Sequence, residues 1–309
     1  MKLAIVFPGQ GSQSAGMMQG FADNAAVKQT FDVASGALGQ DLWKLVAEGP
    51  AEELNQTVNT QPVMLAAAYA MFEAWRAAGG PQAAVMAGHS LGEYTALTAA
   101  GALAFADAVP LVRFRAQAMQ EAVPTGVGGM AAVLGLDDDA VRAVCAEAAQ
   151  GEVVEAVNFN APAQVVIAGH KTAVERACVL AKARGAKRAL VLPVSAPFHA
   201  SLLQPAADKL RHRLAQVSIQ VPQLPVIHNF DVAIHSSGAA IREVLAMQAA
   251  RPVRWVETVQ KMVAMDVTHV VEIGPGKVLQ GLVKRIAPSI QTLAVTDSTS
   301  LDAALEAIK

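Results

Sequence analysis

The fold of this chain is indicated by one stretch, Val85-Met-Ala-Gly-His-Ser-Leu-Gly-Glu-Tyr-Thr-Ala-Leu97. A short apolar run ends at Gly88, and an alanine-rich helical pattern begins just after Ser90. Gly88-His-Ser-Leu-Gly92 matches G-x-S-x-G, the nucleophile elbow, in which small flanking residues let a serine oxygen stand clear of a tight strand-to-helix turn. The helix start leaves amide groups unpaired, so the amide of Leu91 could receive negative charge on a carbonyl oxygen attacked by Ser90. The alternative is a serine that caps a buried helix between two packing glycines.

The composition narrows the class of protein. At 309 residues the chain is long enough for one large domain or two, with a core that needs no disulfides. Although 53% of the residues are hydrophobic, apolar stretches such as residues 95–106 are shorter than the ~20 residues of a membrane helix. The amino terminus lacks the length and cleavage site of a secretory signal. We therefore expect a cytoplasmic protein that does not bind a membrane.

Cysteine usage and net charge exclude further classes. Cys145 and Cys178 are the only cysteines, and both fall in helical patterns, which predicts neither a disulfide framework nor a thiolate metal site. We expect no metal. The formal net charge of −2 argues against a general nucleic-acid binder.

The strands on either side of the elbow predict a parallel sheet. Leu3–Phe7 is a strand that ends in the glycine-punctuated loop Pro8-Gly-Gln-Gly-Ser-Gln13, which is either a plain turn or part of a ligand site at the carboxyl edge of the sheet. Residues 21–78 have a helical pattern, in which Thr60-Gln-Pro62 indicates a cap before a long helix. The succession of strand, helix, strand and helix is typical of a parallel sheet covered on both faces.

The next predicted helix, from Asp107 to Glu121, carries an arginine on its apolar stripe. Arg115 lies four residues from Leu111 and from Met119, so it should point inward. An inward arginine needs an anion. The alternatives are a pair with a protein carboxylate and a side chain that reaches the surface.

Residues 126–195 predict a compact inserted subdomain. Strand and helix patterns there follow the order strand, helix, strand, strand, helix, strand, which is the ferredoxin-like βαββαβ unit. Gly126, Gly128 and Gly129 lie at the start of the segment, and Pro193 and Pro197 lie around its end, as expected of a subdomain boundary. We therefore expect one domain built from residues 1–125 and 196–309, interrupted by this subdomain.

His199 is the best candidate for a general base among the seven histidines. It lies in a loop that follows a predicted strand and precedes a helix. His228 and His269 lie near strands and could be ordinary core residues, and His89 belongs to the elbow itself.

Segments from one end of the chain to the other resemble a single enzyme family. They are Phe7-Pro-Gly-Gln-Gly-Ser-Gln13, Gly88-His-Ser-Leu-Gly-Glu-Tyr94, Ala196-Pro-Phe-His199, Gln248 and Glu272-Ile-Gly-Pro-Gly-Lys277. The combination resembles malonyl-CoA:acyl carrier protein transacylases of bacterial type II fatty acid synthesis. This resemblance implies an α/β-hydrolase-like core with an inserted ferredoxin-like subdomain, in agreement with the patterns above.

The resemblance also implies a role for each site residue. Ser90 is implied to be acylated, with His199 as its base. Gln248 is implied to orient His199 through its backbone carbonyl, in place of the carboxylate of a Ser-His-Asp triad. Gln10 and Leu91 are implied to supply the oxyanion-hole amides, and Arg115 is implied to hold the free carboxylate of the malonyl group.

The implied activity is transfer of malonyl from malonyl-CoA to the phosphopantetheine thiol of acyl carrier protein through a malonyl-serine intermediate, in a ping-pong cycle. The resemblance implies no bound cofactor, coenzyme A thioester as substrate, transient contact with the carrier protein, and a monomer. The resemblance also implies malonyl over methylmalonyl, since related acyltransferase domains with phenylalanine before the histidine, as in Phe198-His199, tend to select malonyl.

Three alternatives stay open: a hydrolase that shares the elbow, a protein without enzymatic activity, and the same chemistry serving a polyketide synthase or a malonate decarboxylase. The hydrolase is disfavoured because hydrolases of this fold carry their histidine near the C-terminus, whereas His199 lies far from it.

Overall fold

The computed structural model describes residues 1–194 and 196–308, so Ser195, the last residue of the predicted subdomain, lies outside the described residues. Along the chain the strands, α-helices and 3-10 helices (η) are β1 Leu3–Phe7, η1 Gln19–Phe21, α1 Ala25–Leu38, α2 Leu42–Glu48, α3 Ala51–Leu54, α4 Thr57–Ala77, β2 Val85–Gly88, α5 Gly92–Ala99, α6 Phe105–Glu121, β3 Gly128–Leu134, α7 Asp138–Ala149, β4 Val154–Ala161, β5 Gln164–His170, α8 Lys171–Ala183, β6 Arg188–Val191, η2 Ser201–Leu203, α9 Gln204–Leu214, β7 Val226–Ile227, α10 Gly238–Gln248, α11 Trp255–Ala264, β8 His269–Ile273, α12 Val278–Ile286, β9 Gln291–Val295 and α13 Ser298–Ile308.

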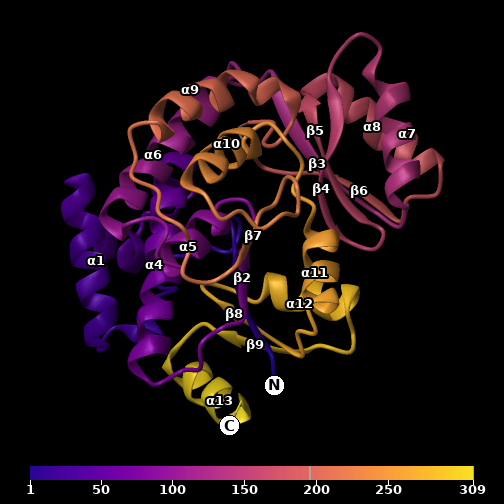
Figure 1. Ribbon diagram of the computed structural model, residues 1–309. Helices are drawn as coiled ribbons and strands as arrows, with labels where there is room; N and C mark the ends of the chain where they lie inside the picture. Colours follow the sequence, from indigo (N-terminus) through magenta and orange to yellow (C-terminus); the bar gives the residue numbers. More distant parts are fainter. Residues whose placement is uncertain (195, 309) are drawn as a thin grey trace.

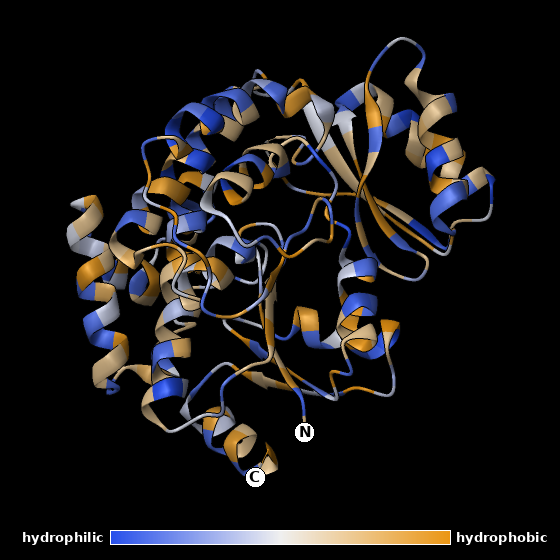
Figure 2. Ribbon diagram, in the orientation of Figure 1, coloured by the Kyte–Doolittle hydropathy of each residue, from blue (hydrophilic) through white to orange (hydrophobic). Residues whose placement is uncertain are grey.

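The larger sheet is parallel and is buried on both faces. Its strand order is β7-β2-β1-β8-β9, and every neighbouring pair is parallel. Side chains alternate along β1, so that Ile5 and Phe7 pack with residues of α4 and α6, whereas Ala4 and Val6 pack with residues of α11 and α12. Helices on both faces explain why β1 is apolar throughout. Figure 1 shows the sheet between these helices, and Figure 2 shows its strands as hydrophobic.

The smaller sheet is antiparallel and has the strand order β4-β5-β3-β6. Helices α7 and α8 pack on one face of it through a separate apolar cluster that contains Val141, Val144 and Val174. In Figure 1 this unit projects from the large sheet at the upper right. The predicted fold class is confirmed, because a parallel core sheet carries a small antiparallel βαββαβ unit. The division of the chain at residues 126–195 stays a prediction.

The predicted cap at Thr60-Gln-Pro62 is wrong, because α4 begins at Thr57 and continues through Pro62. Thr60 is buried, and its hydroxyl donates to the carbonyl of Leu54 at 2.6 Å and to that of Gln56 at 3.0 Å. Burial of this first turn in the core outweighs the local tendency of proline to end a helix.

The loops that follow β1, β2, β7 and β8 meet at one edge of the large sheet, because the carboxyl ends of parallel strands share an edge. Gly274, after β8, packs so closely on Pro8, after β1, that a Cβ atom at Gly274 would lie 2.7 Å from the proline ring. Among the described residues, no helix is long and apolar enough to cross a membrane.

Gly88 at the end of β2 cannot carry a side chain without displacing backbone. A Cβ atom there would lie 1.9 Å from the carbonyl carbon of Gly92. We predict that Gly88→Ala lowers the free energy of unfolding by at least about 1–3 kcal/mol, as overpacked core sites do. The control is Gly36→Ala in α1, where nothing lies within 4 Å and alanine should add about 0.5–1 kcal/mol. Equal urea midpoints for the two variants would contradict this prediction.

Candidate active site

Ser90 occupies a strained turn between β2 and α5. Its φ angle is 51°, in the left-handed region that residues other than glycine rarely adopt. The glycines on either side allow the close approach of backbone that this turn needs, since a Cβ atom on Gly92 would lie 2.1 Å from the carbonyl oxygen of Phe7. The turn presents the Ser90 side chain at the carboxyl edge of the sheet, as a nucleophile elbow does.

Asn229 holds this turn from the neighbouring strand. It follows β7, and its Oδ1 accepts a hydrogen bond from the Ser90 amide at 2.6 Å. Its Nδ2 donates to the carbonyl of Gly88 at 2.7 Å. Both backbone groups of the strained turn are therefore satisfied by one buried carboxamide. Sequence reasoning missed Asn229, although a polar residue two positions after a buried strand at this edge was an available signal.

The structure brings His199 to Ser90. His199 Nε2 lies 2.7 Å from Ser90 Oγ, and His199 Nδ1 lies 2.9 Å from the backbone carbonyl oxygen of Gln248. A carbonyl can only accept, so Nδ1 carries the proton and Nε2 is left to accept from the serine hydroxyl. No carboxylate is hydrogen-bonded to the His199 ring within residues 1–194 and 196–308.

Burial and a nearby charge keep His199 neutral. Burial, followed by the positive charge of Arg115, lowers the pKa of His199 from 6.5 to about 3. At neutral pH the ring is thus unprotonated and can take a proton from Ser90.

Arg115 points inward from α6, with only 1% of its surface exposed. Its terminal nitrogens donate to Gln61 Oε1 at 2.7 Å, to Gln248 Oε1 at 2.9 Å and to Ser90 Oγ at 3.1 Å. Burial lowers the pKa of the Arg115 guanidinium. No ion pair joins Arg115 to a carboxylate in the described part of the chain. The direct carboxylate partner considered as an alternative is therefore not seen there, and a buried cation lies beside the serine with neutral acceptors only.

The other arginine of the helix is placed elsewhere. Arg113 contacts Gln40 and lines a hollow with Gln117, on a different face of α6 from Ser90. Gln61, which sequence reasoning did not single out, is a further acceptor for Arg115. It reaches the site because α4 begins at Thr57, so that Gln61 lies within the helix and faces Arg115.

Ser90 opens into a cavity of about 140 Å³. The cavity is lined by Gln10, Gln61, His89, Ser90, Leu91, Arg115, Met119, Met130, Asn158, Val166, Leu192, Val194, Phe198 and His199. Leu91 precedes the first turn of α5, and Gln10 lies in the loop after β1 with its side chain accepting from Thr57 Oγ1 at 2.9 Å. The structure thus brings all of the predicted site residues together, Gln248 through its contacts with His199 and Arg115. A larger cleft of about 990 Å³ shares Gln10 and Phe198 with this cavity.

The competing histidines have other partners. His228 is fully buried against Glu93, with 2.7 Å between His228 Nδ1 and Glu93 Oε1. His269 contacts Thr268, and His89 contacts Asn160 of β4 at 2.8 Å. No group of three or more histidine, cysteine or acidic side chains that could hold a metal occurs within the described ranges.

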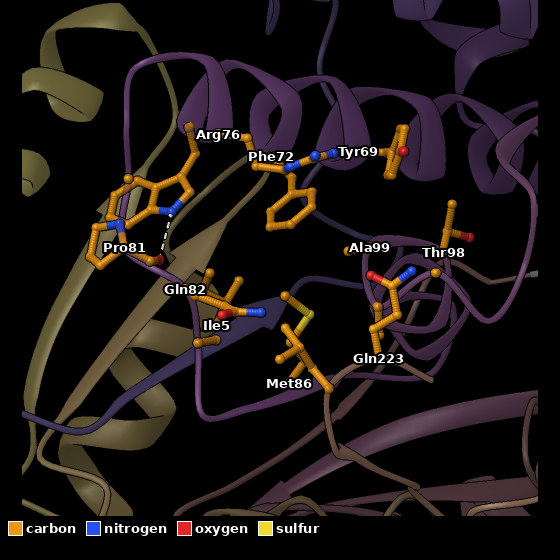
Figure 3. A pocket seen from close by; sticks show the side chains of 16 residues that line it. Ile5, Tyr69, Phe72, Arg76, Pro81, Gln82, Met86, Thr98, Ala99 and Gln223 are labelled. Carbon is orange, nitrogen blue, oxygen red and sulfur yellow. Dashed lines mark hydrogen bonds between the residues drawn. The ribbon is translucent and has the colours of Figure 1, made fainter. Parts of the chain in front are cut away.

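A separate hollow of about 470 Å³ lies between α4, the end of α5 and the middle of the large sheet (Figure 3). Phe72, Ile5 and Met86 line it together with the carboxamides of Gln82 and Gln223. It contains none of the predicted site residues.

Comparison with known proteins identifies the family. A family model described as the acyl transferase domain matches residues 4–301. The chain is 54% identical to the malonyl CoA-acyl carrier protein transacylase of Escherichia coli K12, over 99% of each chain. A solved acyl-carrier-protein S-malonyltransferase from Burkholderia pseudomallei is 66% identical and superposes with a TM-score of 0.98, over 99% of this chain and 100% of the other. A malonyl-transacylase solved in complex with a type II PKS acyl-carrier protein is 51% identical, with a TM-score of 0.98 and the same coverage. The chain therefore belongs to the acyl transferase domain family, among its malonyl-CoA:acyl carrier protein transacylases.

Proposed function

We propose that this chain transfers the malonyl group from malonyl-CoA to the phosphopantetheine thiol of an acyl carrier protein, by way of a malonyl ester on Ser90. One observation carries the proposal. Ser90 Oγ lies 2.7 Å from a neutral His199 and 3.1 Å from the buried guanidinium of Arg115. A nucleophile with its base, beside a cation that contacts only neutral acceptors, suits an acyl group that carries its own carboxylate.

In the first half-reaction, Ser90 Oγ attacks the thioester carbonyl while His199 Nε2 takes the hydroxyl proton. The amides of Gln10 and Leu91 donate to the oxyanion, and Arg115 holds the malonyl carboxylate. The C–S bond then breaks, the proton passes from His199 to the departing sulfur, and coenzyme A leaves as a thiol.

In the second half-reaction, the carrier thiol gives its proton to His199 and attacks the malonyl ester. The C–O bond to Ser90 breaks, and the serine oxygen takes the proton back from His199. One neutral base therefore serves both directions of proton transfer, with the carbonyl of Gln248 fixing its tautomer.

The remaining expectations are proposals of the same kind. Transient binding of an acyl carrier protein is supported by a relative named for that carrier and by a relative solved with the carrier of a type II PKS. We propose that the carrier of this chain is that of fatty acid synthesis. Two free and buried cysteines suit the reducing cytoplasm. We also propose that the protein works as a monomer without a resident cofactor and binds neither nucleic acid nor membrane.

Ser90 should carry the acyl group. Incubation with malonyl-CoA should add one malonyl mass to the peptide that contains Ser90, and adding holo acyl carrier protein should remove it. The Ser90→Ala variant should gain no mass. A stable adduct on another residue of the parent protein, with none on Ser90, would reject the assignment. Discharge by a polyketide carrier but not by a fatty acid carrier would move the protein to the other pathway.

His199 should remain an active base in mildly acidic solution. Because its pKa is lowered to about 3, the ring is neutral from pH 8 down to pH 5, and kcat/KM for acylation should stay nearly flat over that range. Replacing His199 by alanine should slow acylation by roughly 10²- to 10⁴-fold. An acid limb with a midpoint near the ordinary histidine value of 6.5 would show that burial does not depress the pKa.

Arg115 should select the acyl group. Charge-assisted hydrogen bonds are worth about 1.5–3 kcal/mol each, so Arg115→Ala should lower kcat/KM for malonyl-CoA by at least roughly 10- to 100-fold. Acetyl-CoA lacks the carboxylate and should lose far less. Arg113→Ala is the matched control, since Arg113 contacts Gln40 on another face of α6. A folded Arg115→Ala protein that keeps the parental malonyl-to-acetyl ratio would disprove this role.

A further inference from the structure

Among the described residues, Arg115 has no carboxylate in direct contact, although its guanidinium lies 5.4 Å from the centroid of the Tyr94 ring. Its terminal nitrogens meet two carboxamide oxygens and one hydroxyl, and its Nε has no hydrogen-bond partner among the described residues. A buried charge without a compensating charge is costly, so a carboxylate nearby is to be expected.

Glu93 is that nearby carboxylate. It lies in the first turn of α5 and is fully buried. Its Oε2 accepts from the Asn229 amide at 2.9 Å and from Gln248 Nε2 at 2.9 Å, and its Oε1 lies 2.7 Å from His228 Nδ1. Convergent donors and the positive end of a helix both favour an ionised carboxylate.

His228 does not cancel the charge of Glu93. The Nε2 atom of His228 is buried and has no partner within the described ranges. A protonated ring would leave an N–H donor unpaired at that atom, whereas the neutral ring with its proton on Nδ1 donates to Glu93 and buries no unpaired donor. Glu93 therefore keeps a negative charge that can act on Arg115.

Gln248 connects the two charges. Its Nε2 donates to Glu93 Oε2 at 2.9 Å and to the carbonyl of Ser90 at 2.9 Å, while its Oε1 accepts from Arg115 at 2.9 Å. A single carboxamide thus separates the glutamate from the arginine. Burial lowers the pKa of Arg115, and the side chain of Tyr94, followed by the charge of Glu93, raises it against that effect.

We propose that Glu93 is the counterion of Arg115, held one carboxamide away, and that this spacing is what leaves the guanidinium free for the malonyl carboxylate. The proposal rests on the proposed function of Arg115. A carboxylate in direct contact would occupy the N–H groups that the substrate needs, whereas no carboxylate would leave the buried charge uncompensated. Glu93 is then a positioning residue that sets the preference for malonyl without touching it.

The first test removes the charge of Glu93 and keeps its shape. In Glu93→Gln the amide oxygen can still accept from Asn229 and Gln248, while the new NH2 group faces His228 Nδ1. His228 must then move its proton to Nε2, so the variant removes the negative charge at some cost in stability, which thermal melting measures. Without the repulsion between Glu93 and the substrate carboxylate, malonyl-CoA should bind roughly 10-fold tighter relative to acetyl-CoA. Dissociation constants are measured in a Ser90→Ala background, in which neither thioester can acylate the protein.

The second test moves the charge into contact with Arg115. The exchange variant Glu93→Gln with Gln248→Glu keeps the net charge and the same set of side chains, yet places a carboxylate where Gln248 Oε1 now meets Arg115. Malonyl-CoA should then bind at least roughly 10-fold more weakly relative to acetyl-CoA, because the arginine is already paired. The two variants are thus expected to shift the preference in opposite directions, which a general loss of packing would not do.

Control variants distinguish the counterion role of Glu93 from its premise, which is that Arg115 binds the malonyl carboxylate. Glu272→Gln removes another fully buried carboxyl group, which accepts from the amide of Gln280 at 2.7 Å. Burial raises the pKa of Glu272 to about 7, so this control is measured at pH 8, where the group is mostly ionised, and it should leave the malonyl preference unchanged. If Arg115→Ala keeps the preference, the carboxylate site itself is wrongly assigned. If Arg115→Ala abolishes it while the first variant and the exchange variant both keep the parental value, only the counterion proposal is overturned. If Glu93→Gln fails to fold, the exchange variant still tests the proposal. Weaker binding of malonyl-CoA relative to acetyl-CoA would support it, and an unchanged or stronger relative binding would overturn it.

Discussion

The left-handed turn at Ser90 is the constraint on which the rest of the site depends. A φ of 51° at a residue with a side chain is unfavourable, and it persists because the surroundings leave the backbone no other path. Gly88 and Gly92 let β2, α5 and the end of β1 come within distances that no Cβ atom would allow. The Asn229 side chain accepts from the amide of Ser90 and donates to the carbonyl of Gly88, so both backbone groups are hydrogen-bonded. Core packing of the parallel sheet therefore supports a strained backbone at Ser90, the proposed nucleophile.

Electrostatics around this turn are organised by one buried cation. Burial, and after it the charge of Arg115, lowers the pKa of His199, so the ring is neutral in the free protein. A carboxylate that pairs with Arg115 partly cancels the positive charge that lowers the pKa of His199. A bound substrate carboxylate is therefore expected to make His199 a stronger base. Gln248 contacts both His199 and Arg115. Its backbone carbonyl accepts from the His199 ring, and its side-chain oxygen accepts from the Arg115 guanidinium. A single residue at the end of α10 thus connects His199, the proposed base, to Arg115, the proposed site for the malonyl carboxylate.

The small antiparallel sheet completes the cavity that the large sheet begins. Met130, Asn158 and Val166 of its strands line the space around Ser90. Its strand β4 also bonds to the core, since the amide of Phe159 donates to the carbonyl of Val253 at 3.0 Å and the amide of Val253 donates to that of Val157 at 2.8 Å. The inserted unit is therefore tied to the core by backbone as well as by packing, which suits a wall that excludes water from a thioester reaction.

The sequence by itself determined the elements that depend on local pattern. The apolar run before Gly88, the helical period after Ser90 and the alternating strands of residues 126–195 were sufficient for the parallel core, the elbow and the βαββαβ unit, because periodicity and turn chemistry are local properties. The inward direction of Arg115 also followed from its spacing on the helix. The roles of the site residues came instead from resemblance to a family, and they remain proposals.

Only the tertiary structure decided which polar groups meet. Asn229, Gln61 and Glu93 are far from one another in the chain, and no periodic pattern marks them, because each acts through a partner more than fifty residues away. The start of α4 at Thr57 was likewise decided by burial of its first turn, against the local signal of Pro62. The neutral state of His199 depends on burial and on the charge of Arg115, which are properties of the folded chain and not of the residues that flank the histidine.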